Sequence, residues 1–147
     1  MNKKELKNIM LYITMIIFTL AISTSCQKDT PQSDTDLLLI ENYAIENNLD
    51  GEFTDSGLYY VINEPGGANH PSLSSNVTVT YDGYNLSGDP IDDGSFITFK
   101  LSQLIVGWQE GIPLVGTGGK IKLIIPSDMA YGKEVLVFDI TLHYFSK

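Results

Sequence analysis

Between residues 58 and 144 the chain runs through short apolar-rich segments, separated by Gly, Pro, Asn and Asp. Alternation with a period of two residues is typical of strands that place one face on a core and the other in solvent. Strands are predicted over residues 58–62, 77–81, 97–101, 120–125 and 136–144. The last would place Leu136, Phe138, Ile140, Leu142 and Tyr144 on one face, and Asp139, Thr141 and His143 on the other. The pattern predicts an antiparallel sheet with one face on a core.

Two segments have helical character. Residues 106–114 interrupt the strands, so one short helix must cover the sheet and the predicted class is α+β. Residues 37–45 carry apolar side chains at helical spacing behind Asp34 or Asp36 as the N-cap. We expect this helix to pack on its own domain. The alternative is a helix that forms a dimer, and the sequence leaves the oligomeric state unknown.

The N-terminal segment has the features of an export signal. Lys3, Lys4 and Lys7 precede an apolar run over residues 9–22, and small residues then lead to Cys26. The run is shorter than the roughly 20 residues that a membrane-spanning helix needs, so residues 1–25 are predicted to be a signal peptide. The segment resembles that of bacterial lipoproteins, in which the cysteine is lipid-modified and attached to a membrane, although Ser23 stands where Leu is usual. The alternative is an ordinary secreted protein with a stray thiol at Cys26.

The residues after Cys26 suggest where the protein goes and how it is divided. Gln27-Lys28-Asp29 resembles the surface-export signal of lipoproteins in Bacteroidetes-like bacteria, which implies the outer membrane or the cell surface. Polar residues follow, so residues 26–36 are predicted to form a flexible tether. We predict a helical extension over residues 37–56, followed by a domain over residues 57–147. A single domain is expected because 147 residues are too few for two cores.

Composition excludes several functions. The net charge is −9 and the chain contains no Arg, so nucleic acid is a poor candidate partner. Cys26 is the only cysteine and no Cys-x-x-Cys accompanies His70 and His143, so neither an internal disulfide nor a metal or other cofactor is predicted. Nine acidic residues between positions 29 and 64 are interpreted as a solvated face and not as a binding patch.

The segment FKLSQLIVGWQEGIPLVGTGGKIKLIIPSDMAYG, residues 99–132, carries several motifs in a fixed order. Together with VTVTYDGY before it and LVFDITL after it, it resembles the centre of FKBP-type peptidyl-prolyl cis-trans isomerases. The resemblance covers about 70 residues, from Val77 to Tyr144. It implies a curved antiparallel sheet wrapped around one short helix, and an enzyme that isomerises Xaa-Pro bonds in proline-containing segments of client proteins.

The resemblance also implies the site. Trp108 would be the floor of an apolar pocket, with Tyr81, Leu104, Ile105, Tyr131 and Phe138 as walls. The backbone N–H of Ile105 and the hydroxyl of Tyr131 would hold substrate carbonyls, and Asp92 would be the carboxylate at the pocket edge. Each residue also has a structural interpretation: Trp108 and Phe138 as core, Tyr131 as a turn aromatic, and Asp92 as a turn former.

Two departures from the family pattern concern the pocket. Ile91 stands where an aromatic residue usually precedes the pocket-edge Asp, and only residues 133–135 replace a long loop that usually folds over the pocket. The segment over residues 93–96 is also shorter than usual. The sequence therefore predicts an isomerase that assists the folding of extracytoplasmic proteins, with low activity because the flap is missing. The alternatives are a non-catalytic chaperone or protein-binding module, and a lipoprotein domain with only a structural role.

Overall fold

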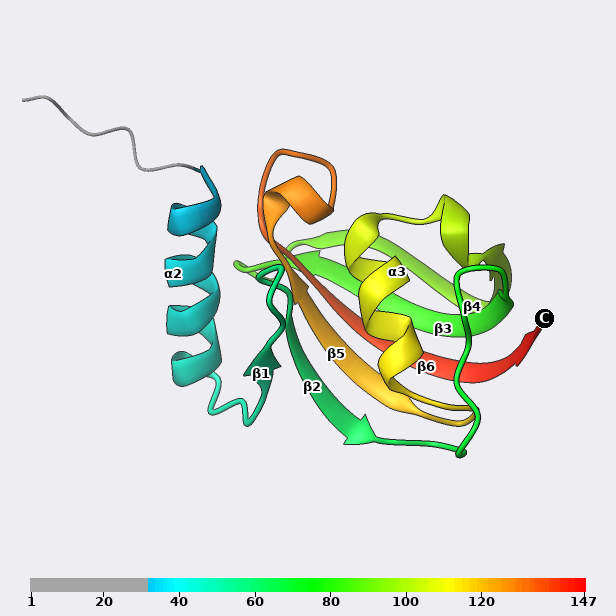
Figure 1. The fold of residues 1–147 in the computed structure, drawn as a ribbon. Helices are drawn as coiled ribbons and strands as arrows, with labels where there is room; N and C mark the ends of the chain where they lie inside the picture. The colour runs from blue at the N-terminus through cyan, green and yellow to red at the C-terminus, as the bar shows by residue number, and fades with distance from the viewer. Residues whose placement is uncertain (1–31) are drawn as a thin grey trace, which may run out of the picture.

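The computed structural model describes residues 32–147, which form one sheet and two α-helices (Figure 1). None of the helices in this part of the chain has the length and apolar character that a bilayer-spanning helix needs. The elements in chain order are α2 (Gln32–Glu46), β1 (Glu52–Phe53), β2 (Tyr59–Glu64), β3 (Asn76–Asn85), β4 (Pro90–Lys100), the 3₁₀ turn η1 (Leu101–Gln103), α3 (Val106–Gly111), the 3₁₀ turn η2 (Ile112–Leu114), β5 (Lys120–Ile125), the 3₁₀ turn η3 (Ser127–Met129) and β6 (Leu136–Ser146).

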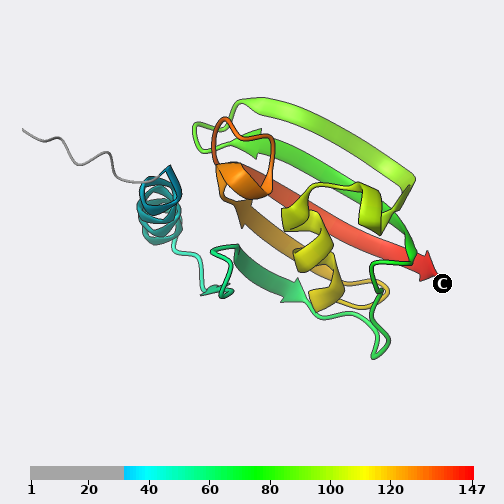
Figure 2. The ribbon, with the colours of Figure 1, turned by 45° about the horizontal axis from the view of Figure 1, so that its top comes forward.

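The six strands form a single antiparallel sheet in the order β1-β2-β5-β6-β3-β4. The sheet curves around α3, which lies in its concave face, as the two views in Figures 1 and 2 show. This arrangement confirms the predicted α+β class. The predicted strand over residues 120–125 has the same bounds as β5.

Helix α3 lies close to the sheet because two of its residues lack side chains. A Cβ atom on Gly107 would come within 2.5 Å of Ile125 Cγ2, and one on Gly111 within 2.5 Å of Leu123 Cδ2. The close contact brings Trp108 down onto the main core. This core also contains buried side chains from β3, β5 and β6, from η1 and η2, and from the residue before β2, among them Leu58, Val79, Leu101, Ile112, Leu123, Phe138 and Leu142.

Helix α2 covers the opposite face of the sheet at one end. Ile40 and Ala44 of α2 belong to a second buried cluster with Tyr59, Ile124 and Val137. The prediction that the helix packs on its own domain is therefore confirmed. The expectation of one buried face is wrong at this end, because Ile124 and Val137 alternate with core-facing residues and are themselves fully buried.

The start of α2 differs from the prediction. Asp34 and Asp36 lie inside the helix and neither is its N-cap. Asp36 is fully buried, and its Oδ2 accepts a hydrogen bond of 2.8 Å from the backbone N–H of Ser127. Residues 32–36, assigned to the flexible tether, are thus helical. The predicted signal peptide, Cys26 and the first part of the tether lie outside the described residues.

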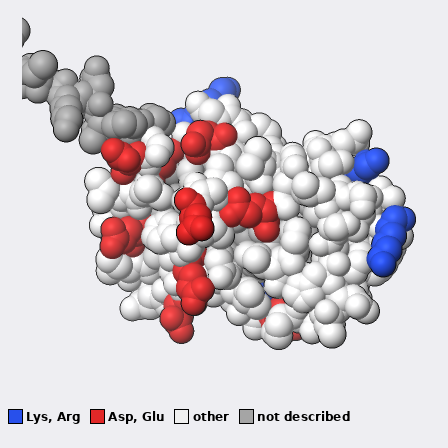
Figure 3. Space-filling model, viewed as in Figure 1, with Lys and Arg blue, Asp and Glu red and all other residues white. Residues whose placement is uncertain are grey.

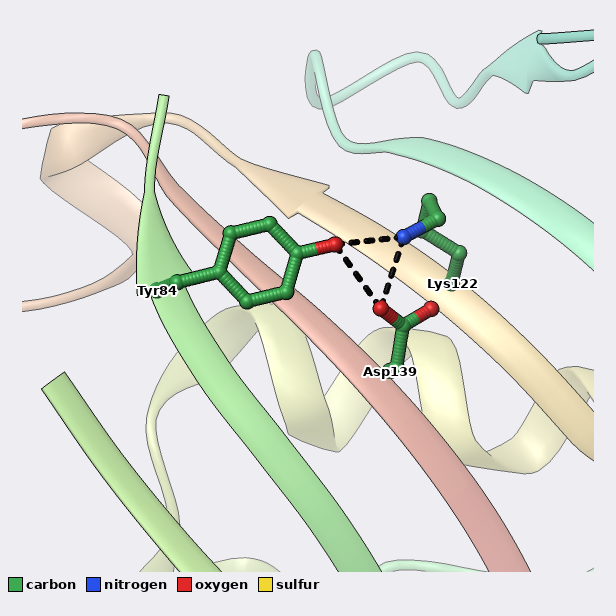
Figure 4. A network of polar contacts seen from close by, with 3 residues as sticks. All are labelled: Tyr84, Lys122 and Asp139. Atoms are coloured by element: carbon green, nitrogen blue, oxygen red, sulfur yellow. Dashed lines mark hydrogen bonds and ion pairs between the residues drawn. The ribbon is translucent and has the colours of Figure 1, made fainter. Parts of the chain in front are cut away.

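Three strands are joined on the outer face by a small polar network (Figure 4). Lys122 Nζ donates to the hydroxyl of Tyr84 at 2.6 Å and to Asp139 Oδ2 at 2.7 Å, and the Tyr84 hydroxyl donates to the same carboxylate oxygen at 2.8 Å. Burial, reinforced by the hydrogen bond to Asp139, raises the pKa of Tyr84, so the phenol remains a donor. The network links β3, β5 and β6 beside the second cluster.

Candidate functional site

One cavity contains all seven residues that the sequence analysis assigned to the site. It has a volume of about 170 Å³ and is lined by Tyr81, Asp92, Phe99, Leu104, Ile105, Trp108, Tyr131 and Phe138. These residues come from β3, β4, the start of α3, the segment after η3, and β6. Leu104, also expected as a wall, is among them. Their roles in binding and catalysis stay a prediction.

Aromatic rings surround Trp108 on three sides. The ring centroids of Tyr81 and Phe138 lie 5.0 and 5.3 Å from that of Trp108, and Phe99 lies at 6.2 Å, all three nearly perpendicular to the indole. Edge-to-face packing of this kind stabilises aromatic clusters. Trp108 is only 4 % exposed, so it is part of the core, and it also forms part of the cavity wall.

The indole nitrogen of Trp108 is buried without an acceptor. Within the described part of the chain, Trp108 Nε1 is the buried side-chain polar atom that lacks a hydrogen-bond partner. Leaving a buried donor unpaired costs about 1–3 kcal/mol. The fold tolerates this cost at a residue that also lines the cavity.

The Tyr81 hydroxyl is fixed by the predicted pocket-edge carboxylate. It donates to Asp92 Oδ2 at 2.9 Å. Burial, and then this hydrogen bond, raises the pKa of Tyr81 to about 12, so the phenol stays neutral in the ordinary pH range. Asp92 is not a turn former: it pairs with Gly83 within the β3–β4 ladder. The pair therefore forms a fixed wall with one negative charge at the rim.

The segment before α3 leaves a backbone donor available. Ile105 is the N-cap of α3, and its carbonyl accepts the amide hydrogens of Trp108 and Gln109. The side chain of Gln109 donates to the Leu104 carbonyl at 2.7 Å, which holds the preceding residue in place. The Ile105 N–H makes no hydrogen bond to another described residue. It can therefore donate to a ligand that enters the cavity.

Tyr131 lies at the open side of the cavity. Its side chain is 61 % exposed, in contrast to the other aromatic walls. The turn that carries it is held by the Gly132 amide, which donates to the Ser127 carbonyl at 2.7 Å. The chain then passes directly into β6 at Leu136, so the short connection predicted over residues 133–135 is present and places no flap over the cavity.

Two residues behave differently from the prediction. Phe99 lines the cavity but was not identified as a wall; the signal was its place within the predicted strand over residues 97–101, at the start of the segment that carries the family motifs. Ile91, expected to replace an aromatic pocket wall, does not line this cavity. It lines a neighbouring one of about 230 Å³ together with Tyr131, Lys133, Glu134 and Leu136.

The cavity suits an apolar ligand and carries no metal-ligand set. In residues 32–147 no three His, Cys, Asp or Glu side chains are placed to share a metal ion. Apart from Asp92, the ionisable side chains that line the cavity are two tyrosines. The arrangement can exclude water from a small apolar group and offer hydrogen bonds at its edges.

Comparison with known proteins identifies relatives of the chain. The family model described as FKBP-type peptidyl-prolyl cis-trans isomerase matches residues 67–143. The isomerase FkpA of Buchnera aphidicola (from Schizaphis graminum) is 39% identical over 103 residues, covering 60% of this chain and 41% of the relative. FkpA of Escherichia coli K12 is 36% identical over 115 residues, covering 69% and 42%.

A solved structure shows the same architecture. The crystal structure of FkpA from Escherichia coli matches with a TM-score of 0.69 at 28% identity, covering 99% of this chain and 74% of that one. The chain aligns with only about two fifths of the length of these two curated relatives. The family match nevertheless covers more than half of the 147 residues, and it includes every residue that lines the cavity. The chain therefore belongs to the family of FKBP-type peptidyl-prolyl cis-trans isomerases.

Proposed function

We propose that the protein is a peptidyl-prolyl cis-trans isomerase that acts on proline-containing segments of extracytoplasmic proteins. The observation that carries the proposal is the cavity of about 170 Å³, in which aromatic rings surround Trp108 and all seven predicted residues meet. Such isomerisation is slow without catalysis, taking tens to hundreds of seconds, and can limit folding.

The cavity suits the chemistry because the reaction needs no acid or base. The barrier of about 18–20 kcal/mol arises from amide resonance, and it falls when the C–N bond twists and conjugation is lost. The twisted amide has a less polar carbonyl than the planar one, so a dry apolar surface favours it. The proline ring would rest against Trp108, Phe99 and Phe138, which together exclude water from the bond that rotates.

Two donors are available for the carbonyl groups around that bond. The Ile105 N–H is unpaired in the described part of the chain, and the Tyr131 hydroxyl lies at the cavity's open side. Tyr81 contributes its ring and not a donor to substrate, because its hydroxyl is already committed to Asp92. These two donors would thus hold the substrate carbonyl groups on either side while the Xaa-Pro bond rotates.

Exposure of the site argues for low turnover. Tyr131 is 61 % exposed and the chain runs from Gly132 to β6 without a covering loop. Because the desolvation on which catalysis depends is incomplete, the second candidate function is a chaperone or protein-binding module that holds extended segments without isomerising them.

The proposed location follows from the N-terminal sequence. An apolar run ends in small residues at the only cysteine, so the protein would be held in the cell envelope by a lipid on Cys26, at the outer membrane or on the cell surface. A family domain on a membrane anchor would act on chains that fold outside the cytoplasm.

The test measures isomerisation of an Xaa-Pro peptide in every protein, and peptide affinity in the wild type and Tyr131→Phe from the fluorescence of Trp108, the only tryptophan. Trp108→Leu removes the flat surface for the proline ring and should abolish most of the activity. Tyr131→Phe removes one hydroxyl and should cost about 0.5–1.5 kcal/mol. Circular dichroism of both variants controls for folding.

The outcomes separate the two functions. Peptide binding with turnover that falls in the order wild type, Tyr131→Phe, Trp108→Leu supports the isomerase. Binding without turnover in the wild type supports the holding module. If proline peptides leave the fluorescence unchanged and the variants match the wild type, the site assignment is wrong.

A further inference from the structure

A second and larger hollow lies on another side of the molecule, outside the isomerase site. It has a volume of about 600 Å³ and is formed by the first half of α2, the segment from β1 to Gly57, and the residues around η3. None of its lining residues lines the Trp108 cavity. We call it the α2 groove.

The floor of the α2 groove is apolar. Leu37, Leu38, Phe53 and Pro126 line it, and Leu38 and Phe53 are 60 % and 43 % exposed. Its size falls within the range of roughly 300–1,000 Å³ that is typical of ligand sites. Exposed apolar side chains gathered in one hollow lower the free energy of any complex that covers them.

The rim of the α2 groove carries one sign of charge. Asp34, Glu41, Asp55 and Asp128 line it, and no lysine of residues 32–147 does. In Figure 3 acidic side chains gather over α2 and the neighbouring β1 region, while lysines appear only at the upper and right-hand margins. Carboxylates of like sign around a low-dielectric floor attract cations and repel anions.

The walls of the α2 groove are held in place. Asp36 ties α2 to Ser127, next to Pro126 and Asp128. On the other side the Ser56 hydroxyl donates to the Glu110 carboxylate of α3 at 2.7 Å. Preformed walls reduce the entropy lost when a segment binds.

We propose that the α2 groove binds a short cationic segment of another protein, in which Lys or Arg alternates with large apolar residues. The apolar side chains would cover Leu38 and Phe53, and the cations would meet the four rim carboxylates. The charge excludes nucleic acid and anionic lipid as occupants. The acidic N-terminal part of the chain is then a recognition surface and not merely a solvated face.

The test uses the full chain and a labelled peptide of alternating Leu and Lys without proline, followed by fluorescence anisotropy. A Ser-for-Leu peptide keeps its charge, and a Glu-for-Lys peptide keeps its apolar residues. We expect only the Leu/Lys peptide to bind with saturation, and its binding to weaken with salt as surface charges are screened.

Two matched pairs of variants locate the peptide. Asp34→Lys with Glu41→Lys should weaken binding about tenfold or more, whereas Glu46→Lys with Asp50→Lys, which makes the same charge change outside the α2 groove, should change it much less. Leu38→Ser should weaken binding, whereas Ile45→Ser, equally exposed on the same helix, should not. All four proteins should keep the wild-type isomerisation rate.

Three results would overturn the proposal. Equal loss in the two charge variants would show general electrostatic attraction only. Displacement by a proline peptide, or loss of binding in Trp108→Leu, would place the peptide in the isomerase cavity. A wild-type dimer that Leu38→Ser converts to a monomer in sedimentation would show that a second copy of the chain occupies the α2 groove.

Discussion

Asp36 joins two parts of the molecule that are 91 positions apart in the sequence. Its buried carboxylate accepts the Ser127 amide, and the Ser127 carbonyl in turn accepts the amide of Gly132, next to Tyr131. The extension helix therefore supports the turn that presents a site residue.

Asp36→Ala should destabilise the protein because it leaves the Ser127 amide buried without its acceptor, at a cost of about 1–3 kcal/mol. Asp36→Asn keeps an acceptor oxygen and should cost less. Urea unfolding gives both values. Thr35→Ala, at the exposed neighbouring position, should stay within about 0.5 kcal/mol of the wild type. An equal effect at positions 35 and 36 would contradict the prediction.

Tyr81 predicts a dependence of stability on alkaline pH. Its pKa is about 12 in the fold and 10.0 in the unfolded reference, so the folded state favours the protonated phenol. This contribution is fully present below pH 10 and is lost as the pH rises through 12. Urea unfolding from neutral to alkaline pH should show the fall, and Tyr81→Phe should make it shallower. Tyr84, whose pKa is also raised, accounts for a remaining slope. Identical slopes in the two proteins would refute the role of Tyr81.

The individual residues of the site were easier to predict than their surroundings. Trp108, Tyr81 and Phe138 sit in motifs whose order the sequence shows, and the structure places them around one cavity. Asp36 resembles an N-cap in the sequence because an Asp directly before an apolar run often caps a helix. Its actual partner, Ser127, lies too far along the chain for local patterns to reveal it.

At the scale of elements, the short connection between Gly132 and Leu136 decides how exposed the site is. Replacing residues 133–135 with a longer loop that contains Ile-Pro should raise kcat/KM severalfold, because it would exclude water from the twisted amide. A loop of the same length made of Gly and Ser is the control and should give a smaller gain. No gain from either loop would show that the missing cover does not limit turnover.

The prediction of which side chains face the core was wrong where the pairing between strands is irregular. Tyr144 was predicted on the core-facing side of the last strand, but it is 56 % exposed. The pairing of β3 with β6 shifts between Thr78 and Val79, so the alternation reverses and Phe145 packs on the core instead. A bulge inserts one residue into the period of two, which no alternation pattern can anticipate. The first half of β4 was not predicted as a strand for a different reason: its Asp and Gly residues are typical of turns.

At the scale of the whole molecule, the lipid anchor remains a prediction about residues outside the described part of the chain. Cys26→Ala should move the protein from the membrane fraction to the soluble fraction and leave the isomerisation rate of the domain unchanged. Fractionation followed by mass spectrometry of the N-terminus makes the measurement. A wild-type protein that is soluble and keeps a free thiol would refute the anchor.

The strand order has a consequence for how this protein is made. The two strands at the centre of the sheet, β5 and β6, come last in the chain among the six strands, and β2 is connected to β3 only through them. Until β6 emerges, nothing links the β3–β4 hairpin to the strands β1, β2 and β5, and Phe138 is absent from the cavity. Sheets built from such distant pairings fold slowly, because loop closure must precede the contacts that reward it. A protein proposed to help other chains fold outside the cytoplasm would thus complete its own sheet only after β6 has been synthesised.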